Sequence, residues 1–164
     1  MRSMRAAAFA VALSLAMTPT QSAVAAEDPL HFFEGRTESI GTVRLMMKKP
    51  FRSKAIGNGE IKPDGSLVLV QRVYDQGEQP RERRWHMRRV GPGRYSGTMS
   101  EARGAVTVEE IDGKYRFRFR MDGSVSVEQW LIPSADGRSA RSKVTIRKYG
   151  IQVGSSNAVI QKVN

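Results

Sequence analysis

The sequence predicts an all-β protein, an antiparallel meander of about nine or ten strands that closes into a barrel. The clearest observation is the segment 114–121, KYRFRFRM, in which a basic side chain alternates with a large apolar one. Successive side chains of a β-strand point to opposite faces, so this strand has one apolar and one basic face. Similar segments recur along the chain, and glycine-bearing turns such as Asp112-Gly113 and Asp122-Gly123 separate them. Beyond residue 26, no segment has the apolar spacing of an amphipathic helix.

Each candidate strand combines this alternation with turn residues at its ends. The candidates cover residues 38–47, 53–61, 66–74, 83–90, 94–101, 105–111, 114–121, 124–132, 140–148 and 152–161. Sequential antiparallel strands either close on themselves or leave two exposed edges, and closure removes the edges. We therefore predict a barrel, with a two-sheet sandwich as the alternative.

The N-terminal segment has a different character. Arg2 and Arg5 precede the small apolar stretch 6–17, and residues 22–26 are small. This is the pattern of a secretory signal peptide, and the apolar stretch is shorter than the roughly 20 residues of a membrane span. We expect cleavage after Ala25 or Ala26, a periplasmic location, and a single domain over 27–164 without a transmembrane segment. An uncleaved amphipathic anchor is the alternative.

The composition limits the chemistry and suggests partners. No cysteine occurs, so the chain has no disulfide, no thiolate metal site and no lipid-attachment cysteine. The formal net charge is +11, and it stays strongly positive when the signal peptide is removed. An exported protein rarely meets nucleic acid, so we expect anionic lipid, lipopolysaccharide phosphate or an acidic partner instead. The charge could equally serve solubility alone.

The interior of such a barrel is either filled by side chains or hollow enough for one small ligand. Strand alternation predicts which residues point inward. The candidate ligand-binding residues are Trp85, Met87, Tyr115, Phe117, Phe119 and Trp130, the last as the alternative to an inward face formed by Val125, Val127 and Leu131. A filled core is the competing interpretation.

Arginine rows follow the opposite faces of two of these strands. The candidate anion-binding surface residues are Arg84, Arg88, Arg116, Arg118 and Arg120. The guanidinium group suits phosphate and carboxylate because it donates two parallel hydrogen bonds. Two strands separate the rows in the predicted order, and an ordinary solvated face is the alternative.

Residues that could perform catalysis are few. His31 and His86 are the only histidines, and His86 falls on the strand face opposite Trp85. The adjacent pair Glu109-Glu110 diverges on a strand, so the two carboxyl groups are poorly placed to share a proton or a metal ion. Nucleophile, phosphate-loop and metal-binding motifs are missing from the sequence. We therefore expect that the protein is not an enzyme and that it has no catalytic residue, metal site or cofactor.

Short strings in a fixed order run through the chain: Phe32-Phe33-Glu34-Gly35, Gly41, Arg83-Arg84-Trp85, Gly93 to Thr98, Gly104, Trp130, Lys148-Tyr149-Gly150 and Val153-Gly154. In order and spacing they resemble the bacterial envelope family called domain of unknown function 3833 (DUF3833). The resemblance implies an exported, often lipid-anchored, lipocalin-like β-barrel without an assigned activity. Anchoring is not carried over, because the lipidated cysteine of many relatives is absent. Relatives also tend to carry acidic residues just before the tryptophan that matches Trp130 and after the Gly-Thr that matches Gly97-Thr98. This chain has Glu128-Gln129 and Ser100-Glu101 there, so no role that rests on those carboxylates is carried over.

Together these observations predict an exported, non-enzymatic, lipocalin-like barrel that binds an apolar or amphipathic small molecule. The alternative is a basic module with a filled interior that docks on anionic lipid, lipopolysaccharide or an acidic partner. The sequence leaves the identity of the ligand and the oligomeric state open.

Overall fold

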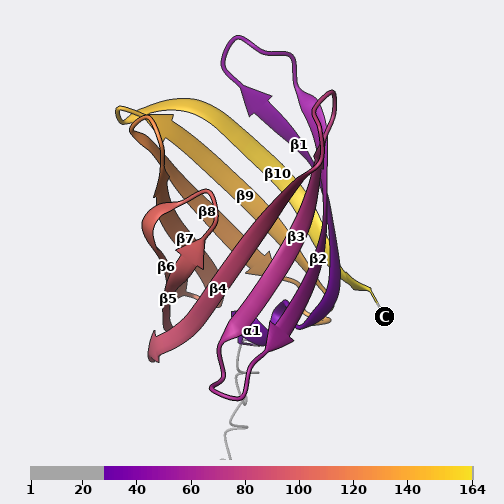
Figure 1. Cartoon of the computed structure of the whole chain (residues 1–164), viewed down its shortest axis with the longest axis vertical. Helices are drawn as coiled ribbons and strands as arrows, with labels where there is room; N and C mark the ends of the chain where they lie inside the picture. The colour runs from indigo at the N-terminus through magenta and orange to yellow at the C-terminus, as the bar shows by residue number, and fades with distance from the viewer. Residues whose placement is uncertain (1–27, 164) are drawn as a thin grey trace, which may run out of the picture.

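The computed structural model describes residues 28–163, so the predicted signal peptide lies outside the described residues. Within that range the chain forms one short helix and ten strands (Figure 1). Their bounds are α1 Pro29–Phe32, β1 Gly35–Leu45, β2 Phe51–Ile61, β3 Leu67–Asp75, β4 Arg81–Gly91, β5 Arg94–Met99, β6 Arg103–Ile111, β7 Lys114–Met121, β8 Val125–Pro133, β9 Ser139–Lys148 and β10 Ile151–Val163.

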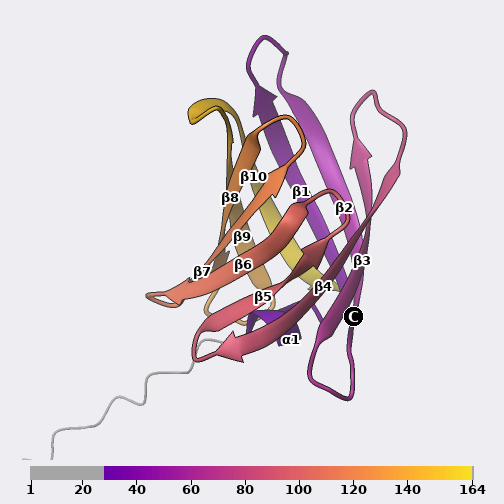
Figure 2. The ribbon, with the colours of Figure 1, turned by 60° about the vertical axis from the view of Figure 1, so that its left-hand side comes forward.

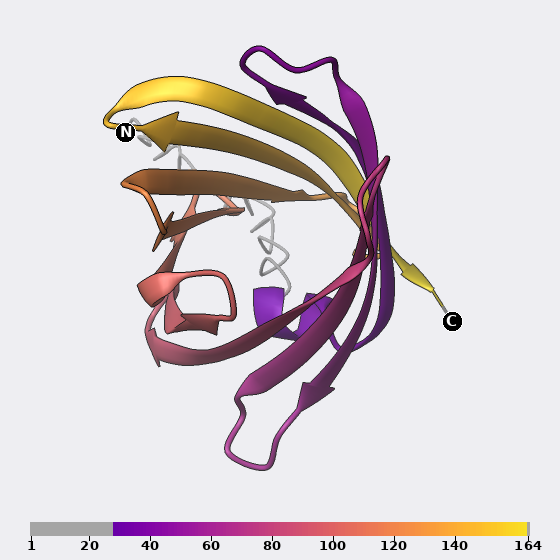
Figure 3. The same ribbon diagram turned by 45° about the horizontal axis from the view of Figure 1, so that its top comes forward.

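The strands form a closed antiparallel barrel, as predicted, and not a sandwich. Each strand pairs with its neighbours in the chain, and β1 pairs with β10 to close the sheet. This closing pair runs without a break from Arg36 opposite Val163 to Leu45 opposite Gly154. The barrel therefore has no free sheet edge, which explains how a long meander avoids pairing with other chains. Figures 2 and 3 show the ring of strands from the side and from its open end.

The two Asp-Gly turns beside β7 differ. At the first, Ile111 pairs directly with Lys114, and Asp112 and Gly113 have φ values of 51° and 72°, as a two-residue hairpin of type I′ requires. At the second, Met121 pairs with Val125, so the loop holds three residues. Its positive φ values fall on Gly123 and Ser124. The Asp-Gly signal thus predicted both turn positions, but not the longer second loop.

A short helix, α1, covers one end of the barrel, although the sequence predicted no helix beyond residue 26. The carboxylate of Asp28 accepts a hydrogen bond of 2.9 Å from the backbone N–H of Leu30, and Pro29 occupies the first turn. Both are ordinary helix-start features. The helix sits close to β2 at Gly59, where an added Cβ would lie 1.9 Å from the carbonyl oxygen of Phe33. Glycine at this position therefore lets the helix close the floor of the barrel.

The packed core lies between this floor and the middle of the barrel. Tyr95 and Tyr115 meet edge to face at 6.4 Å between ring centroids, and Trp85 packs in the same manner on Phe117 and Phe119. The alternation predicted for β7 is confirmed, since Tyr115, Phe117 and Phe119 are all buried. No helix among residues 28–163 combines the length and apolar character that a membrane span requires.

Candidate ligand cavity

A cavity of about 370 Å³ runs through the barrel from α1 to the opposite end. Leu30 and Phe33 of the helix line its floor, and Leu45 and Phe51 line it near the β1–β2 hairpin. The volume falls within the range of small-molecule sites. The sequence left a filled core and a hollow interior as alternatives, and the barrel formed by residues 28–163 has a hollow interior.

Four of the six predicted ligand-binding residues line this cavity. Trp85 and Met87 reach it from β4, and Phe117 and Phe119 reach it from β7. Tyr115 also points inward but does not line the cavity, because it is buried against Tyr95 nearer the floor. Tyr115 therefore belongs to the packed core.

Trp130 was predicted wrongly as an interior residue. Its neighbours Gln129 and Leu131 face inward, so Trp130 lies on the outer wall opposite Arg116 of β7. The guanidinium carbon of Arg116 lies 5.7 Å from the centre of the indole ring, and the indole N–H donates to Glu128 at 3.2 Å. Gln129 takes the inward position instead. Its side chain has a hydrogen-bond partner inside the barrel, because its amide N–H donates to the Ser142 hydroxyl at 2.9 Å.

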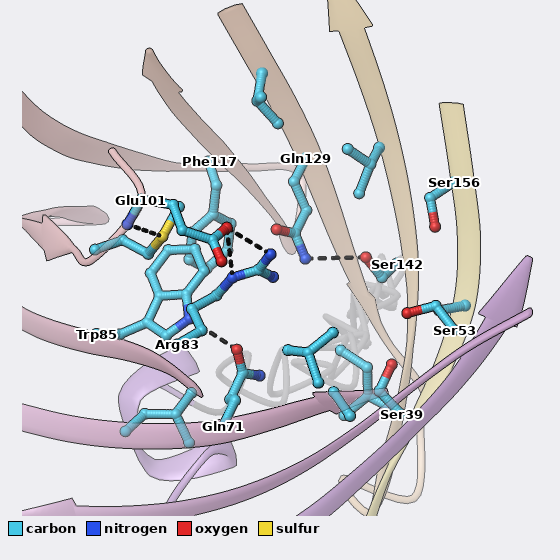
Figure 4. A pocket seen from close by; sticks show the side chains of 18 of the residues that line it. Ser39, Ser53, Gln71, Arg83, Trp85, Glu101, Phe117, Gln129, Ser142 and Ser156 are labelled. Carbon is cyan, nitrogen blue, oxygen red and sulfur yellow. Dashed lines mark hydrogen bonds and ion pairs between the residues drawn. The ribbon is translucent and has the colours of Figure 1, made fainter. Parts of the chain in front are cut away.

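Polar side chains interrupt the apolar lining of the cavity (Figure 4). The indole N–H of Trp85 donates to the side-chain oxygen of Gln71 at 2.8 Å, which fixes the plane of the ring. Ser39, Ser156 and the Gln129–Ser142 pair also line the cavity. A few placed hydrogen-bonding groups in an apolar cavity are the usual means of orienting a ligand.

Two ion-paired arginines line the upper part of the cavity. The Arg83 guanidinium donates to Glu101 at 2.8 and 3.2 Å, and Arg81 donates to Glu101 at 3.1 Å and to Asp75. Burial pushes the pKa of Asp75 up, but hydrogen bonds from Ser53 and Arg81 outweigh it and leave that pKa below its ordinary value. These charges are therefore largely compensated within the protein.

The inward direction of Arg81 and Arg83 was not predicted from the sequence. The signal was present, because positions 81, 83, 85 and 87 share one strand face and the last two were correctly predicted as inward. The side chains of Arg81 and Arg83 are 41% and 25% exposed, so both line the cavity without being fully withdrawn from water. Their shared partner, Glu101, comes from the β5–β6 turn and is distant in sequence.

The predicted outer rows lie on the outside of the barrel. Arg84 and Arg88 stand on β4, the row that includes Arg116, Arg118 and Arg120 stands on β7, and β5 and β6 separate the rows as expected. Part of the charge is neutralised locally, since Glu109 accepts from Arg116 at 2.6 Å and from Arg118 at 3.4 Å. The hydrogen bond from Arg116 holds the pKa of Glu109 below its usual value. Anion binding by these rows stays a prediction.

The two histidines lie away from the cavity. His86 is exposed on the outer wall, 3.3 Å from the Ser66 hydroxyl. His31 is exposed in α1, and its carbonyl accepts a hydrogen bond from Lys162 at 3.0 Å. Among residues 28–163, no group of three or more acidic or histidine side chains is arranged to hold a metal ion.

Residues 11–162 match the model of a family described as "protein of unknown function (DUF3833)". The chain belongs to this family. The match covers nearly the whole sequence and confirms the resemblance inferred from the short strings. No curated protein matches the chain.

Among solved structures, the chain resembles the S-type phycobiliprotein lyase CPES from Guillardia theta, with a TM-score of 0.65 and 9% identity over 82% of this chain and 90% of that one. At this identity the likeness shows the fold alone, a lipocalin-like barrel. It nevertheless contradicts the prediction that the chain is not an enzyme, because a barrel of this shape is described as a lyase. That prediction rested on missing sequence motifs, and a barrel can bring together site residues that lie far apart in sequence.

Proposed function

We propose that this protein binds an amphipathic small molecule inside its barrel. The observation that carries the proposal is the hollow, mainly apolar interior of about 370 Å³ with polar groups at defined heights. Burying about 200 Å² of apolar ligand surface would contribute roughly 5 kcal/mol before ordering costs are subtracted. The fold that the chain shares with a phycobiliprotein lyase supports the proposal that the barrel interior is a binding site.

The distribution of polar groups suggests how the ligand lies. The floor is apolar, with Leu30 and Phe33 of α1 facing the cavity, whereas Arg83 and Glu101 stand toward the other end. An apolar tail toward α1 and a polar head toward Arg83 would leave no polar ligand group against an apolar wall. Fatty acids and phospholipids have this division and are the first ligands to test.

The two tryptophans provide a matched pair of fluorescence reporters. The chain has only Trp85 and Trp130, one lining the cavity and one on the outer wall. In a Trp130→Phe variant, Trp85 is the sole reporter, and we expect its emission to change saturably as ligand fills the cavity. In a Trp85→Phe variant, Trp130 should give a flat titration with the same ligands.

Two outcomes would contradict cavity binding by this ligand class. One is a flat titration of the Trp85 reporter with every fatty acid and phospholipid tried. The other is an equal response of the Trp130 reporter, because that response would place the ligand on the wall or in a micelle. Circular dichroism of both variants checks that the barrel is retained.

We also propose that residues 1–26 direct export to the periplasm and are removed. The charged start, short apolar stretch and small residues before Glu27 support this proposal. Expression of the whole chain in a Gram-negative bacterium, followed by fractionation and mass spectrometry, tests it. Periplasmic protein beginning at Ala26 or Glu27 is the expected result, and an intact N-terminus in the cytoplasm would contradict it.

A further inference from the structure

The open end of the barrel carries apolar side chains that the protein leaves in solvent. In the β1–β2 hairpin, Met46 is 58% exposed and Met47 is 99% exposed. At the β9–β10 turn, Tyr149 is 76% exposed and Ile151 is 66% exposed. Single exposed apolar residues are common, but four at two hairpin tips at one end of a barrel form a feature that needs an explanation.

These two tips lie at the same end of the molecule. The backbone N–H of Met46 donates to the carbonyl of Val153 at 2.8 Å, which ties the β1–β2 hairpin to the start of β10. Figures 1 and 2 show both tips at the end opposite α1. The cavity-lining residues Leu45 and Phe51 flank the methionine hairpin. The exposed apolar surface is therefore next to the apolar lining of the cavity.

Backbone conformation makes the choice of residues at these tips more unusual. Met47 and Tyr149 have φ values of 64° and 50°. This left-handed region suits glycine and asparagine, and a bulky side chain there is an outlier that folding alone does not favour. At the comparable β6–β7 turn, the position equivalent to Tyr149 is Asp112. A methionine and a tyrosine at such positions indicate a use for their side chains outside the fold.

The two chain segments that form these tips carry charge of one sign. The segment 44–52, RLMMKKPFR, contains four cationic residues and no acidic residue. The segment 147–152, RKYGIQ, adds Arg147 and Lys148, again without an acid. Lys48, Lys49 and Lys148 are exposed. These cations flank the apolar tip residues along the chain, whereas the arginines that line the cavity are paired with Glu101 and Asp75.

We propose that this rim docks the open end of the barrel onto an anionic lipid bilayer. The rim is defined as Met46, Met47, Lys48, Lys49, Lys148, Tyr149 and Ile151. Methionine, isoleucine and tyrosine side chains insert at the boundary between headgroups and acyl chains, where an aromatic ring with one polar end is favoured. Lysines beside them attract negatively charged headgroups, each strengthening binding about fivefold. The combination distinguishes a membrane surface from an acidic protein, which would need the charge but not the exposed apolar tips.

Sedimentation with phospholipid vesicles tests the docking. The protein is made from the whole chain and purified in the form that the cell produces, with its N-terminus determined by mass spectrometry. Vesicles contain phosphatidylglycerol and phosphatidylcholine, or phosphatidylcholine alone, without any added cavity ligand. We expect binding to the anionic vesicles that weakens with added salt, because exposed charges are screened.

Two rim variants separate the apolar and the charged contributions. Met47→Asn with Tyr149→Asn removes two apolar tips, and asparagine tolerates the left-handed backbone, so the fold should not suffer. Lys48→Gln with Lys49→Gln removes two cations. We expect each double variant to bind anionic vesicles at least about tenfold more weakly than the parent.

The matched controls remove exposed apolar or cationic side chains elsewhere on the barrel. Val90→Thr with Val159→Thr removes two exposed apolar side chains, and Arg84→Gln with Arg88→Gln removes two cations from the outer wall. Both controls should bind like the parent. Binding that survives the rim changes, or that is lost in the wall controls instead, overturns the proposal.

Two further outcomes also overturn it. Equal binding of the parent to neutral and anionic vesicles would remove the role of the lysines. Absence of vesicle binding, with the rim variants converting a dimer into a monomer in analytical ultracentrifugation, would make the rim a contact between two copies of the chain. Because the vesicles are tested without a cavity ligand, docking and ligand binding can fail separately.

Discussion

The polar side chains inside the barrel are held by partners from different strands, and these partners explain their positions. Arg83 of β4 is tolerated in an apolar cavity because Glu101, from the β5–β6 turn, accepts two of its hydrogen bonds. Asp75 is held in the same manner by Arg81. The side chains of Asp75, Arg83 and Glu101 are 12%, 25% and 25% exposed, so these pairs compensate charges that are partly withdrawn from water.

Replacing Asp75 by asparagine tests the strength of this arrangement through its pH dependence. The folded protein holds the pKa of Asp75 below the ordinary value of 3.8, so the ionised carboxylate favours the folded state. The contribution is present above the unfolded pKa and is lost as the pH falls through the lower, folded pKa. We expect Asp75→Asn to lower the free energy of unfolding near neutral pH by about 1 to 2 kcal/mol, and this difference to shrink below pH 3.8.

Urea denaturation of both proteins over a pH series measures the difference. Glu78→Gln, an exposed carboxyl group in the β3–β4 loop, is the matched control and should leave the pH profile unchanged. A difference between Asp75→Asn and the parent that persists undiminished into strong acid would show that the carboxylate charge is not its cause.

The sequence could predict which large residues face the interior, but not which polar ones do. Period-two alternation placed Trp85, Met87, Phe117 and Phe119 correctly, because each lies in a long regular strand. On β8 it gave two alternatives, the face of Val125, Val127 and Leu131 or Trp130, and the structure has the first of them inward. Only the position of Ser142, on another strand, shows that Gln129 has a partner inside.

The strands were predictable as elements, because alternation and turn residues are local properties. The predicted segments correspond to β1 to β10 with shifts at their ends, and the Asp-Gly turns lie where expected. The helix α1 was not predicted, because four residues are too few to show helical periodicity. Its cap at Asp28 and the proline at position 29 were the only signals.

Gly59 is where α1 and the barrel wall come closest, and its substitution tests whether the helix is an integral floor. An alanine Cβ at this position would lie 1.9 Å from the Phe33 carbonyl oxygen, so either the helix or β2 has to move. We expect Gly59→Ala to lower the free energy of unfolding by about 1 to 3 kcal/mol, as other overpacked sites do. Hydrogen exchange of the amides of residues 30–33 should become faster, because the floor is displaced.

Asn58→Ala is the matched control for that change. Asn58 is the next residue on β2 and is exposed on the outer face, so its substitution should have little effect on stability or on exchange in α1. If both variants lose the same stability, or if exchange of the amides of residues 30–33 stays slow in Gly59→Ala, then the close approach does not determine the position of the helix.

At the scale of the whole molecule, closure of the barrel could be predicted, because an open sheet would leave two exposed edges. Whether the interior is hollow or filled could not be predicted. Whether a barrel is hollow depends on side-chain volumes summed over all ten strands and on the floor formed by α1. Small residues at inward positions, among them Ser39, Ala55, Ser156 and Ala158, leave the space that the aromatic side chains do not fill. A protein selected only for stability would fill such a space.

A cavity kept for a ligand predicts opposite effects of filling on stability and binding. Ser39→Val with Ser156→Val adds apolar volume to the cavity wall without changing the outer surface. We expect the free energy of unfolding in urea to rise by about 0.5 to 2 kcal/mol, as cavity-filling changes commonly do. Ligand affinity, measured with Trp85 as the sole tryptophan, should fall because the space is occupied. Ser126→Val on the exposed outer face of β8 should change neither quantity. A filled variant that binds as tightly as the parent would mean that the ligand does not enter this space, whatever the gain in stability.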